Sequence, residues 1–254
     1  MSALKKLVSA LLVLTLAVSG GLLAWHGLHR TSAAPPVGQT QTPTVPAPPA
    51  SVPDTVSTLC VAGDLVMHIP IINSCRTDDG YDFTGLFDEA RPYYESADYA
   101  AACIETTFNG PPYSGFPQFC APDQLAGDLK SVGLDLLSTA SNHSLDTWFS
   151  GLTRTLDVLD GAGLDHVGTY RTQEERDTVK VIDVGGIRLA VLAYTYGTNG
   201  LPKDEHPYCV NVFTTDYMTN CGEIDYELLK SDLARARQTD ADAIAVFMHW
   251  GQEY

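Results

Sequence analysis

The middle of the sequence holds an apolar strand that runs directly into polar residues of three chemical types. The segment starts at Asp135 and reaches Asn142, His143 and Asp146 within a few residues. A buried strand with this ending restricts the fold, because it places an amide, an imidazole and a carboxylate on one rigid edge of a sheet. Open α/β sheets bind their ligands at that edge. The sequence therefore predicts a functional site at the carboxyl end of this strand.

Three other apolar runs end in the same way. Asp64, Glu105 and His249 each directly follow a run that predicts a strand. Taken singly, each residue is more often a structural turn, cap or loop residue than a functional one. Parallel neighbours in one sheet, however, bring their carboxyl ends to a common edge. Carboxylates, amide oxygens and imidazoles are ligands of hard to borderline divalent metals. We therefore expect Asp64, Glu105, Asn142 and His249 to converge as candidate metal ligands.

Predicted strands and helices alternate along the chain. Two alternating segments on either side of Gly185-Gly186 predict a hairpin. The alternation is typical of a mainly parallel sheet covered by helices on both faces, with antiparallel strands entering at the hairpin. Strands are predicted at 58–63, 99–104, from 135 onward, 166–168, 179–184, 187–194, 210–213 and 243–248. Helices are predicted at 81–94, 122–132, 148–160 and 223–238.

The first thirty residues are predicted to target the chain rather than to join its core. Lys5 and Lys6 precede an uncharged apolar stretch, residues 7–25, that is long enough to span a membrane. The lysine pair indicates that the amino end stays inside. We expect residues 1–30 to be an uncleaved signal anchor of a single-pass protein of the cell membrane, with the C-terminal domain outside the cytoplasm. The alternative is a signal peptide cleaved after Ala33, which gives a secreted protein.

Residues 31–56 are predicted to be a disordered linker. They hold nearly half of the 15 prolines of the chain, interleaved with Thr, Gln, Ala and Ser. Such a segment cannot bury enough apolar surface to fold, and it tends towards an extended polyproline conformation. The linker would hold the remaining domain, residues 57–254, away from a membrane or wall.

The chain is strongly acidic, with 31 Asp and Glu against 15 Lys and Arg and a formal net charge of −16. Proteins that hold nucleic-acid backbones carry clustered Lys and Arg, and this sequence has no such cluster. The charge thus argues against nucleic acid as a partner, and it favours a soluble extracellular domain. An anionic polymer would bind only if metal ions intervened.

The six cysteines leave the disulfide pattern of an exported chain open. Cys60 and Cys103 fall inside predicted core strands, so we expect them to be buried thiols. No Cys-x-x-Cys spacing occurs, which argues against a zinc knuckle or a thioredoxin-type centre. Two pairs could form disulfides, Cys209 with Cys221 and Cys75 with Cys120.

Four segments at predicted strand ends carry a family resemblance. They are Ala62-Gly-Asp64-Leu-Val-Met67, Cys103-Ile-Glu105-Thr106, Ser141-Asn-His143-Ser-Leu-Asp146 and His249-Trp-Gly-Gln-Glu253-Tyr254. In this order they resemble successive motifs of the CapA/PgsA family, which is associated with bacterial poly-γ-glutamate capsule synthesis and export. No single motif is specific, but the ordered set is. The resemblance covers about residues 57–254.

The resemblance implies an α/β fold of the metallophosphatase-like (calcineurin-like) type, a sandwich of two mixed sheets flanked by helices. It also implies that Asp64, Glu105, Asn142 and His249 bind divalent metal ions, with Mn, Fe and Zn as candidates. The family usually has a second Asn where this chain has Ser141, a change expected to be tolerated because that side chain is not an expected ligand.

His143 would be the catalytic acid or electrophile beside the metals. Asp146 is predicted to orient His143 rather than to bind metal, and Glu253 is expected to act in the same indirect way. His68, four residues after Asp64, is a weaker candidate that could equally be a loop residue.

The resemblance implies a role in capsule or poly-γ-glutamate polymer synthesis or export, beside other capsule-synthesis membrane proteins. Two metals can clamp the attacking and leaving oxygens of a phosphoryl displacement while a His protonates the leaving group. The expected chemistry is metal-dependent hydrolysis, with a phosphoester or an anionic polymer as substrate. Two alternatives remain open: a non-catalytic accessory module that binds polymer or wall, and a receptor-like module with a degenerate site.

The last predicted strand ends in His249, and the sequence ends at Tyr254. In the resembling family, further His ligands follow the His-Trp-Gly motif. We therefore expect the domain to be incomplete at its C-terminus, to bind divalent metal weakly and to lack hydrolytic activity. A longer version is also expected to be more soluble, because it would cover the last strand.

Overall fold

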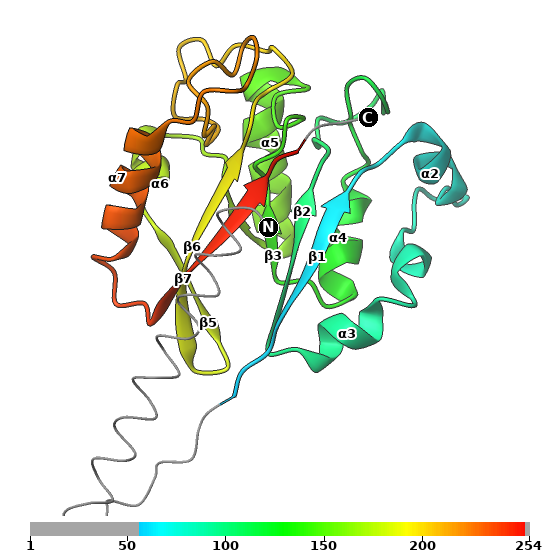
Figure 1. Ribbon diagram of the computed structural model, residues 1–254. Helices are drawn as coiled ribbons and strands as arrows, with labels where there is room; N and C mark the ends of the chain where they lie inside the picture. Colours follow the sequence, from blue (N-terminus) through cyan, green and yellow to red (C-terminus); the bar gives the residue numbers. More distant parts are fainter. Residues whose placement is uncertain (1–55, 252–254) are drawn as a thin grey trace, which may run out of the picture. The chain divides into compact units, whose positions relative to one another are not determined.

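The computed structural model describes residues 56–251, which form two β-sheets with helices on their outer faces (Figure 1). The α/β class is confirmed. The predicted anchor at 1–30, nearly all of the linker at 31–56, and Glu253 lie outside the described residues. Among the residues that are described, no helix is long and apolar enough to cross a bilayer.

The first sheet is entirely parallel, in the order β1-β2-β3-β4. The prediction of two mixed sheets is therefore wrong for this one. Each connection between its strands carries at least one helix, and such a crossover returns the chain in the same direction. The strands are β1 (Leu59–Leu65), β2 (Tyr99–Ile104), β3 (Leu136–Ser138) and β4 (Asp165–Val167).

The second sheet is mixed, in the order β5-β6-β7. β5 (Lys180–Val184) and β6 (Ile187–Thr195) form the predicted antiparallel hairpin, and β7 (Ala243–His249) pairs with β6 in parallel. The two residues of the turn, Gly185 and Gly186, have φ angles of 58° and 93°. A two-residue turn with positive φ at both positions matches the twist of the strands, and glycine adopts it without steric cost.

The predicted helix over 81–94 is wrong, because the structure has a 3₁₀ turn and a separate short helix there. Pro92 lies in the first turn of the second of these, where its ring prevents a preceding helix from continuing. The predicted strand at 210–213 forms only isolated bridges, to Thr169 and Thr195. The helices are α2 (Ile69–Ser74), η1 (Thr84–Phe87), α3 (Arg91–Ser96), α4 (Gln124–Ser131), α5 (Trp148–Ala162), α6 (Gln173–Asp177) and α7 (Tyr226–Ala236).

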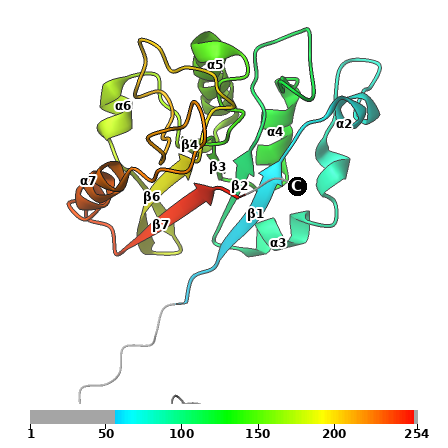
Figure 2. The ribbon, with the colours of Figure 1, turned by 45° about the horizontal axis from the view of Figure 1, so that its top comes forward.

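The core has three apolar layers. Between the sheets, Ala101 and Leu136 of the first sheet pack in one cluster with Val191 and Ala193 of the second. A larger cluster joins the other face of the first sheet to α4 and α5. A third joins the outer face of β6 to α7, so the order is helices, sheet, sheet, helix (Figures 1 and 2).

β1 carries one extra residue near its end. Val61 pairs with Ala101, but Asp64 pairs with Cys103, so three steps along β1 match two along β2. Successive side chains of a strand alternate between faces. The extra residue therefore puts Asp64 on the same face as Cys103, in the place where a regular ladder would put Gly63.

Asp232 on α7 forms the most buried ion pair of the described residues and is 1% exposed. It accepts a hydrogen bond from Arg176 of α6 at 2.6 Å and from the Tyr194 hydroxyl of β6 at 2.9 Å, and it also pairs with Arg235. Burial, together with Asp232, raises the pKa of Tyr194. Arg176, Asp232 and Arg235 line a cavity of about 490 Å³, and their paired charges indicate a structural role.

His166 of β4 also lines that cavity, and its burial predicts how the stability of the fold depends on pH. Burial lowers the pKa of His166, Arg171 and Lys180 lower it further, and Asp160 acts in the opposite direction. Below about pH 6.5 the unfolded chain therefore takes up a proton that the folded chain resists, and stability falls with the pH. Urea titrations from about pH 7.5 to about pH 5.5 should show that His166→Gln loses less stability than the wild type. Equal losses would contradict this account.

Candidate functional site

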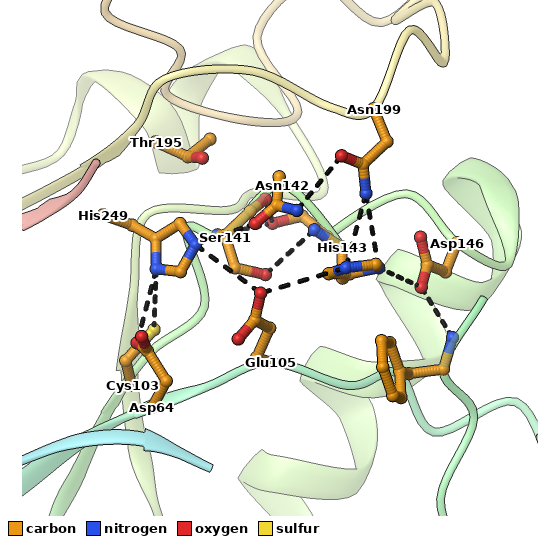
Figure 3. Close-up of polar contacts among 12 residues, drawn as sticks. Asp64, Cys103, Glu105, Ser141, Asn142, His143, Asp146, Thr195, Asn199 and His249 are labelled. Carbon is orange, nitrogen blue, oxygen red and sulfur yellow. Dashed lines mark hydrogen bonds and ion pairs between the residues drawn. The ribbon is translucent and has the colours of Figure 1, made fainter. Parts of the chain in front are cut away.

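The four candidate ligands converge at the carboxyl ends of the strands (Figure 3). His249, at the end of β7, lies among the other three. Its Nδ1 is 3.3 Å from Asp64 Oδ1, and its Nε2 is 2.8 Å from Asn142 Oδ1 and 3.6 Å from Glu105 Oε1. The structure thus brings together residues that are separated by up to 185 positions in sequence. The parallel strands supply this arrangement, because they all end at the same side of the molecule.

Cys103 joins this group, although the sequence predicts it as a core thiol. One oxygen of Asp64, the sulfur of Cys103 and one ring nitrogen of His249 lie within 4.8 Å of one another. The Cys103 Sγ is 4.0 Å from His249 Nδ1. A signal for this was present in the sequence, since Cys103 stands two residues before Glu105 and alternate residues of a strand face the same way.

Hydrogen bonds indicate which nitrogen of His249 carries a proton. Asn142 Nδ2 donates to Asn199 Oδ1 at 3.0 Å, which leaves the Asn142 amide oxygen to accept from His249 Nε2. In the neutral imidazole, Nδ1 then presents a lone pair towards Asp64 and Cys103. A proton or a metal ion at Nδ1 would satisfy all three groups. With a proton on Nδ1, the hydrogen bond from His249 lowers the pKa of the Asp64 carboxyl, although partial burial acts the other way.

The donor set fits a divalent metal. On one side of His249 are a carboxylate and a thiol, and on the other are the Glu105 carboxylate and the Asn142 amide oxygen. Glu105 and Asn142 are 8% and 2% exposed, so little water competes for them. Imidazole, carboxylate and thiol are the protein ligands of zinc, and carboxylate with amide oxygen suits harder ions.

His143 and Asp146 form a buried pair beside this cluster. The Asp146 Oδ2 is 2.7 Å from His143 Nδ1 and also accepts a hydrogen bond from the Phe119 backbone N–H at 2.6 Å. Because a carboxylate only accepts, the proton of His143 lies on Nδ1. The Nε2 faces the cluster, 3.9 Å from Glu105 Oε1. The Phe119 ring packs edge-on against the imidazole at 4.6 Å and helps to fix its plane.

Serine side chains hold the loop that carries Asn142 and His143. The Ser144 hydroxyl lies 2.7 Å from the Thr139 carbonyl oxygen and 2.6 Å from the Ser141 carbonyl oxygen. The Ser141 hydroxyl accepts from the His143 backbone N–H at 3.2 Å. Ser141, where the resembling family has Asn, therefore serves the loop backbone.

Asn199 is a site residue that the sequence did not indicate. It lies in the loop after β6, has a φ of 52°, and its Nδ2 is 3.3 Å from His143 Nδ1 and 3.4 Å from His143 Nε2 (Figure 3). Its Oδ1 accepts from Asn142, so one side chain connects the metal-ligand candidates to the His143–Asp146 pair. No local pattern predicts a contact across 56 residues.

His68 lies apart from the cluster, and the two disulfides that the sequence allows are not formed among the described residues. His68 is exposed at the start of α2 and meets the Phe119 ring at 4.9 Å. All six cysteines lie in the described part of the chain and are free thiols, so neither of the two possible disulfides is present. Cys103 is buried as predicted, and Cys60 is half-buried.

Comparisons with known proteins agree with the motifs. Residues 58–254 match the family described as bacterial capsule synthesis protein PGA_cap. The chain is 23% identical to "Capsule biosynthesis protein CapA" of Bacillus anthracis over 209 residues. This alignment covers 78% of this chain and 47% of that protein. It is 25% identical to "PGA biosynthesis protein CapA" of Bacillus subtilis strain 168 over 226 residues. This alignment covers 85% of this chain and 54% of that protein.

A third relative has no function in its name. It is the "Uncharacterized protein y4sH" of Sinorhizobium fredii, 26% identical over 145 residues, which cover 54% of this chain and 30% of that protein. The chain spans about half the length, or less, of the curated relatives it matches. The family match, in contrast, covers nearly all of the domain that holds the converging side chains. The chain therefore belongs to the bacterial capsule synthesis protein family PGA_cap.

Proposed function

We propose that this chain acts in the synthesis or export of a capsule polymer of the poly-γ-glutamate class, and that its strand-end cluster is a metal-dependent phosphoesterase-type site. The observation that carries the proposal is the position of His249 between two sets of donors, with the His143–Asp146 pair alongside. The substrate would be a phosphoester or an anionic polymer of the cell envelope.

The side chains divide the work between binding and proton transfer. Asp64, Glu105, Asn142 and His249 would hold the ions, which supply Lewis acidity towards a phosphoryl oxygen. His143 would carry out the proton transfer. With Nδ1–H held by Asp146, its Nε2 is aimed at the cluster and can give a proton to a leaving oxygen.

Asp146 positions that imidazole. It is 4% exposed, and its Oδ2 accepts hydrogen bonds from His143 Nδ1 and from the Phe119 backbone N–H. A buried carboxylate that holds Nδ1–H fixes the orientation of the ring, so that Nε2 faces the cluster.

We further propose a location outside the cytoplasm, with the apolar stretch at 7–25 as the contact with the cytoplasmic membrane. Other membrane proteins of capsule synthesis would be the partners there. The support is the sequence of the first 56 residues, an uncharged apolar stretch followed by a proline-rich segment.

A second candidate function is a non-catalytic module that holds an anionic polymer through bound ions. The formal net charge of −16 favours it, because such a polymer would be repelled unless cations lay between the two. This binding module would use the same bound ions as the first candidate but would not hydrolyse the polymer or a phosphoester.

We expect a His249→Ala variant to bind divalent metal at least about tenfold more weakly than the wild type, because His249 contacts both sets of donors. Metal analysis after dialysis measures this. His68→Ala is the matched control, since His68 lies near the same end of the sheet but outside the cluster. Unchanged metal content in His249→Ala would reject the site. Hydrolysis assays on phosphoesters and on poly-γ-glutamate then separate the two candidate functions.

A further inference from the structure

We propose that Cys103 is itself a metal ligand, so that the side of the site formed by Asp64, Cys103 and His249 Nδ1 selects a thiophilic divalent ion such as Zn²⁺. The inference rests on the metal site of the proposed function and specifies the class of ion for one half of it. The resulting site would be a mixed one, with one thiolate-containing position next to one built from the oxygens of Glu105 and Asn142.

The strand geometry places Cys103 for this role. Ala101, Cys103 and Glu105 alternate along β2 and its end, so they share the face that looks towards the second sheet, where Ala101 packs. Two positions on one face are about 6.6 Å apart along a strand. The His249 ring reaches both, with Nδ1 towards Cys103 and Nε2 towards Glu105 (Figure 3).

The extra residue of β1 completes the group. It makes Asp64 the direct partner of Cys103 in the β1–β2 ladder and turns both side chains to the same face. Without it, Gly63 would stand opposite Cys103, and the sulfur would have no carboxylate next to it. A cysteine that only packed in the apolar core would not need a carboxylate beside its sulfur.

The distances fit a four-coordinate ion. Ligands at zinc bond lengths in a tetrahedral site lie about 3.3–3.6 Å from one another. The Asp64 oxygen and His249 Nδ1 are 3.3 Å apart, and the Cys103 sulfur is 4.0 Å from the same nitrogen. A shift of a few tenths of an ångström at the cysteine rotamer would bring the sulfur and the nitrogen into range, and all three atoms already lie within 4.8 Å of one another. The half-exposed Asp64 leaves room for a water ligand.

Charge favours a cation at this point. The Asp64 and Glu105 carboxylates lie on either side of His249 beside the Cys103 sulfur, and two carboxylates attract a dication. When an ion binds, the sulfur–metal bond forms as the S–H bond breaks, and the proton leaves to solvent. Sulfur prefers Zn²⁺, Cd²⁺ and Co²⁺ to the hard ions Mg²⁺ and Mn²⁺.

Cobalt(II) added to the full-length metal-free protein gives a direct readout. If the sulfur binds the metal, a thiolate-to-cobalt charge-transfer band appears in the near ultraviolet. The band should be lost in Cys103→Ser and kept in Cys221→Ser, a matched control whose thiol lies in the loop between β6 and α7. In parallel titrations, Cys103→Ser should weaken Cd²⁺ binding at least about tenfold while Mn²⁺ binding changes by less than about threefold.

Each outcome has a separate meaning. Metal binding to the wild type without the cobalt band would overturn the role of Cys103 and leave the proposed function standing. No binding of any divalent ion would reject the metal site and both proposals with it. Cys103→Ala serves as a second variant, and the circular dichroism spectrum and melting temperature of each variant show that the fold is kept. A cobalt band that persists in both folded Cys103 variants would also overturn the inference.

Discussion

A His143→Ala variant is expected to hydrolyse a model phosphoester about 10²–10⁴-fold more slowly than the wild type, with its metal content unchanged. His143 points Nε2 at the cluster without being part of the group around His249 Nδ1, so its loss should affect proton transfer rather than metal binding. Turnover and bound metal are to be measured on the same preparation. Loss of metal together with activity would show that His143 is a ligand instead.

Asp146→Asn provides the companion measurement. The variant keeps the shape of the side chain but removes the carboxylate that accepts the Nδ1 proton of His143. A positioning role for Asp146 predicts a drop in kcat with the metal content and the melting temperature unchanged. A purely structural role for Asp146 predicts a lower melting temperature and an unchanged kcat of the folded protein. A phosphoester leaving group of low pKa should reduce the effect of both variants, because it needs no protonation.

Asp232→Ala is expected to lower the free energy of unfolding by about 3–5 kcal/mol, because it leaves Arg176 buried without its partner. Urea titration with a fixed m-value measures the loss. The control is Asp240→Ala, which breaks the pair with Arg188 at a carboxylate that is 69% exposed. This variant should change stability by less than about 1 kcal/mol. Similar losses in the two variants would contradict the structural importance of the buried pair.

Local sequence patterns predict the strands and the residues at their ends well, for a physical reason. Apolar runs define buried strands, and parallel pairing then requires Asp64, Glu105 and Asn142 to end at one edge. The hairpin is equally local, since Gly185 and Gly186 together specify the turn. Where one short segment decides the geometry, the sequence is sufficient.

The features that the sequence did not predict depend on contacts between distant segments or on counting along a strand. Asn199 reaches His143 from a loop whose composition shows only that it is a loop. Cys103 becomes a neighbour of Asp64 through one extra residue in β1, which no propensity reveals. The error over 81–94 was avoidable, because Pro92 marks a helix start rather than a helix interior.

The position of His249 has a consequence for how the domain matures. Asp64, Cys103, Glu105 and Asn142 come from the first sheet and the segments that follow its strands, whereas His249 is the last residue of β7 in the second. A chain whose sheets have formed but not yet docked therefore has every donor and no site. A metal that binds only the docked form adds its binding free energy to the association of the sheets. If the proposed site binds metal, its occupancy then reports that the two sheets have docked. A cavity made by Val191→Ala, in the apolar layer between the sheets, should then weaken metal binding although Val191 is not one of the candidate ligands.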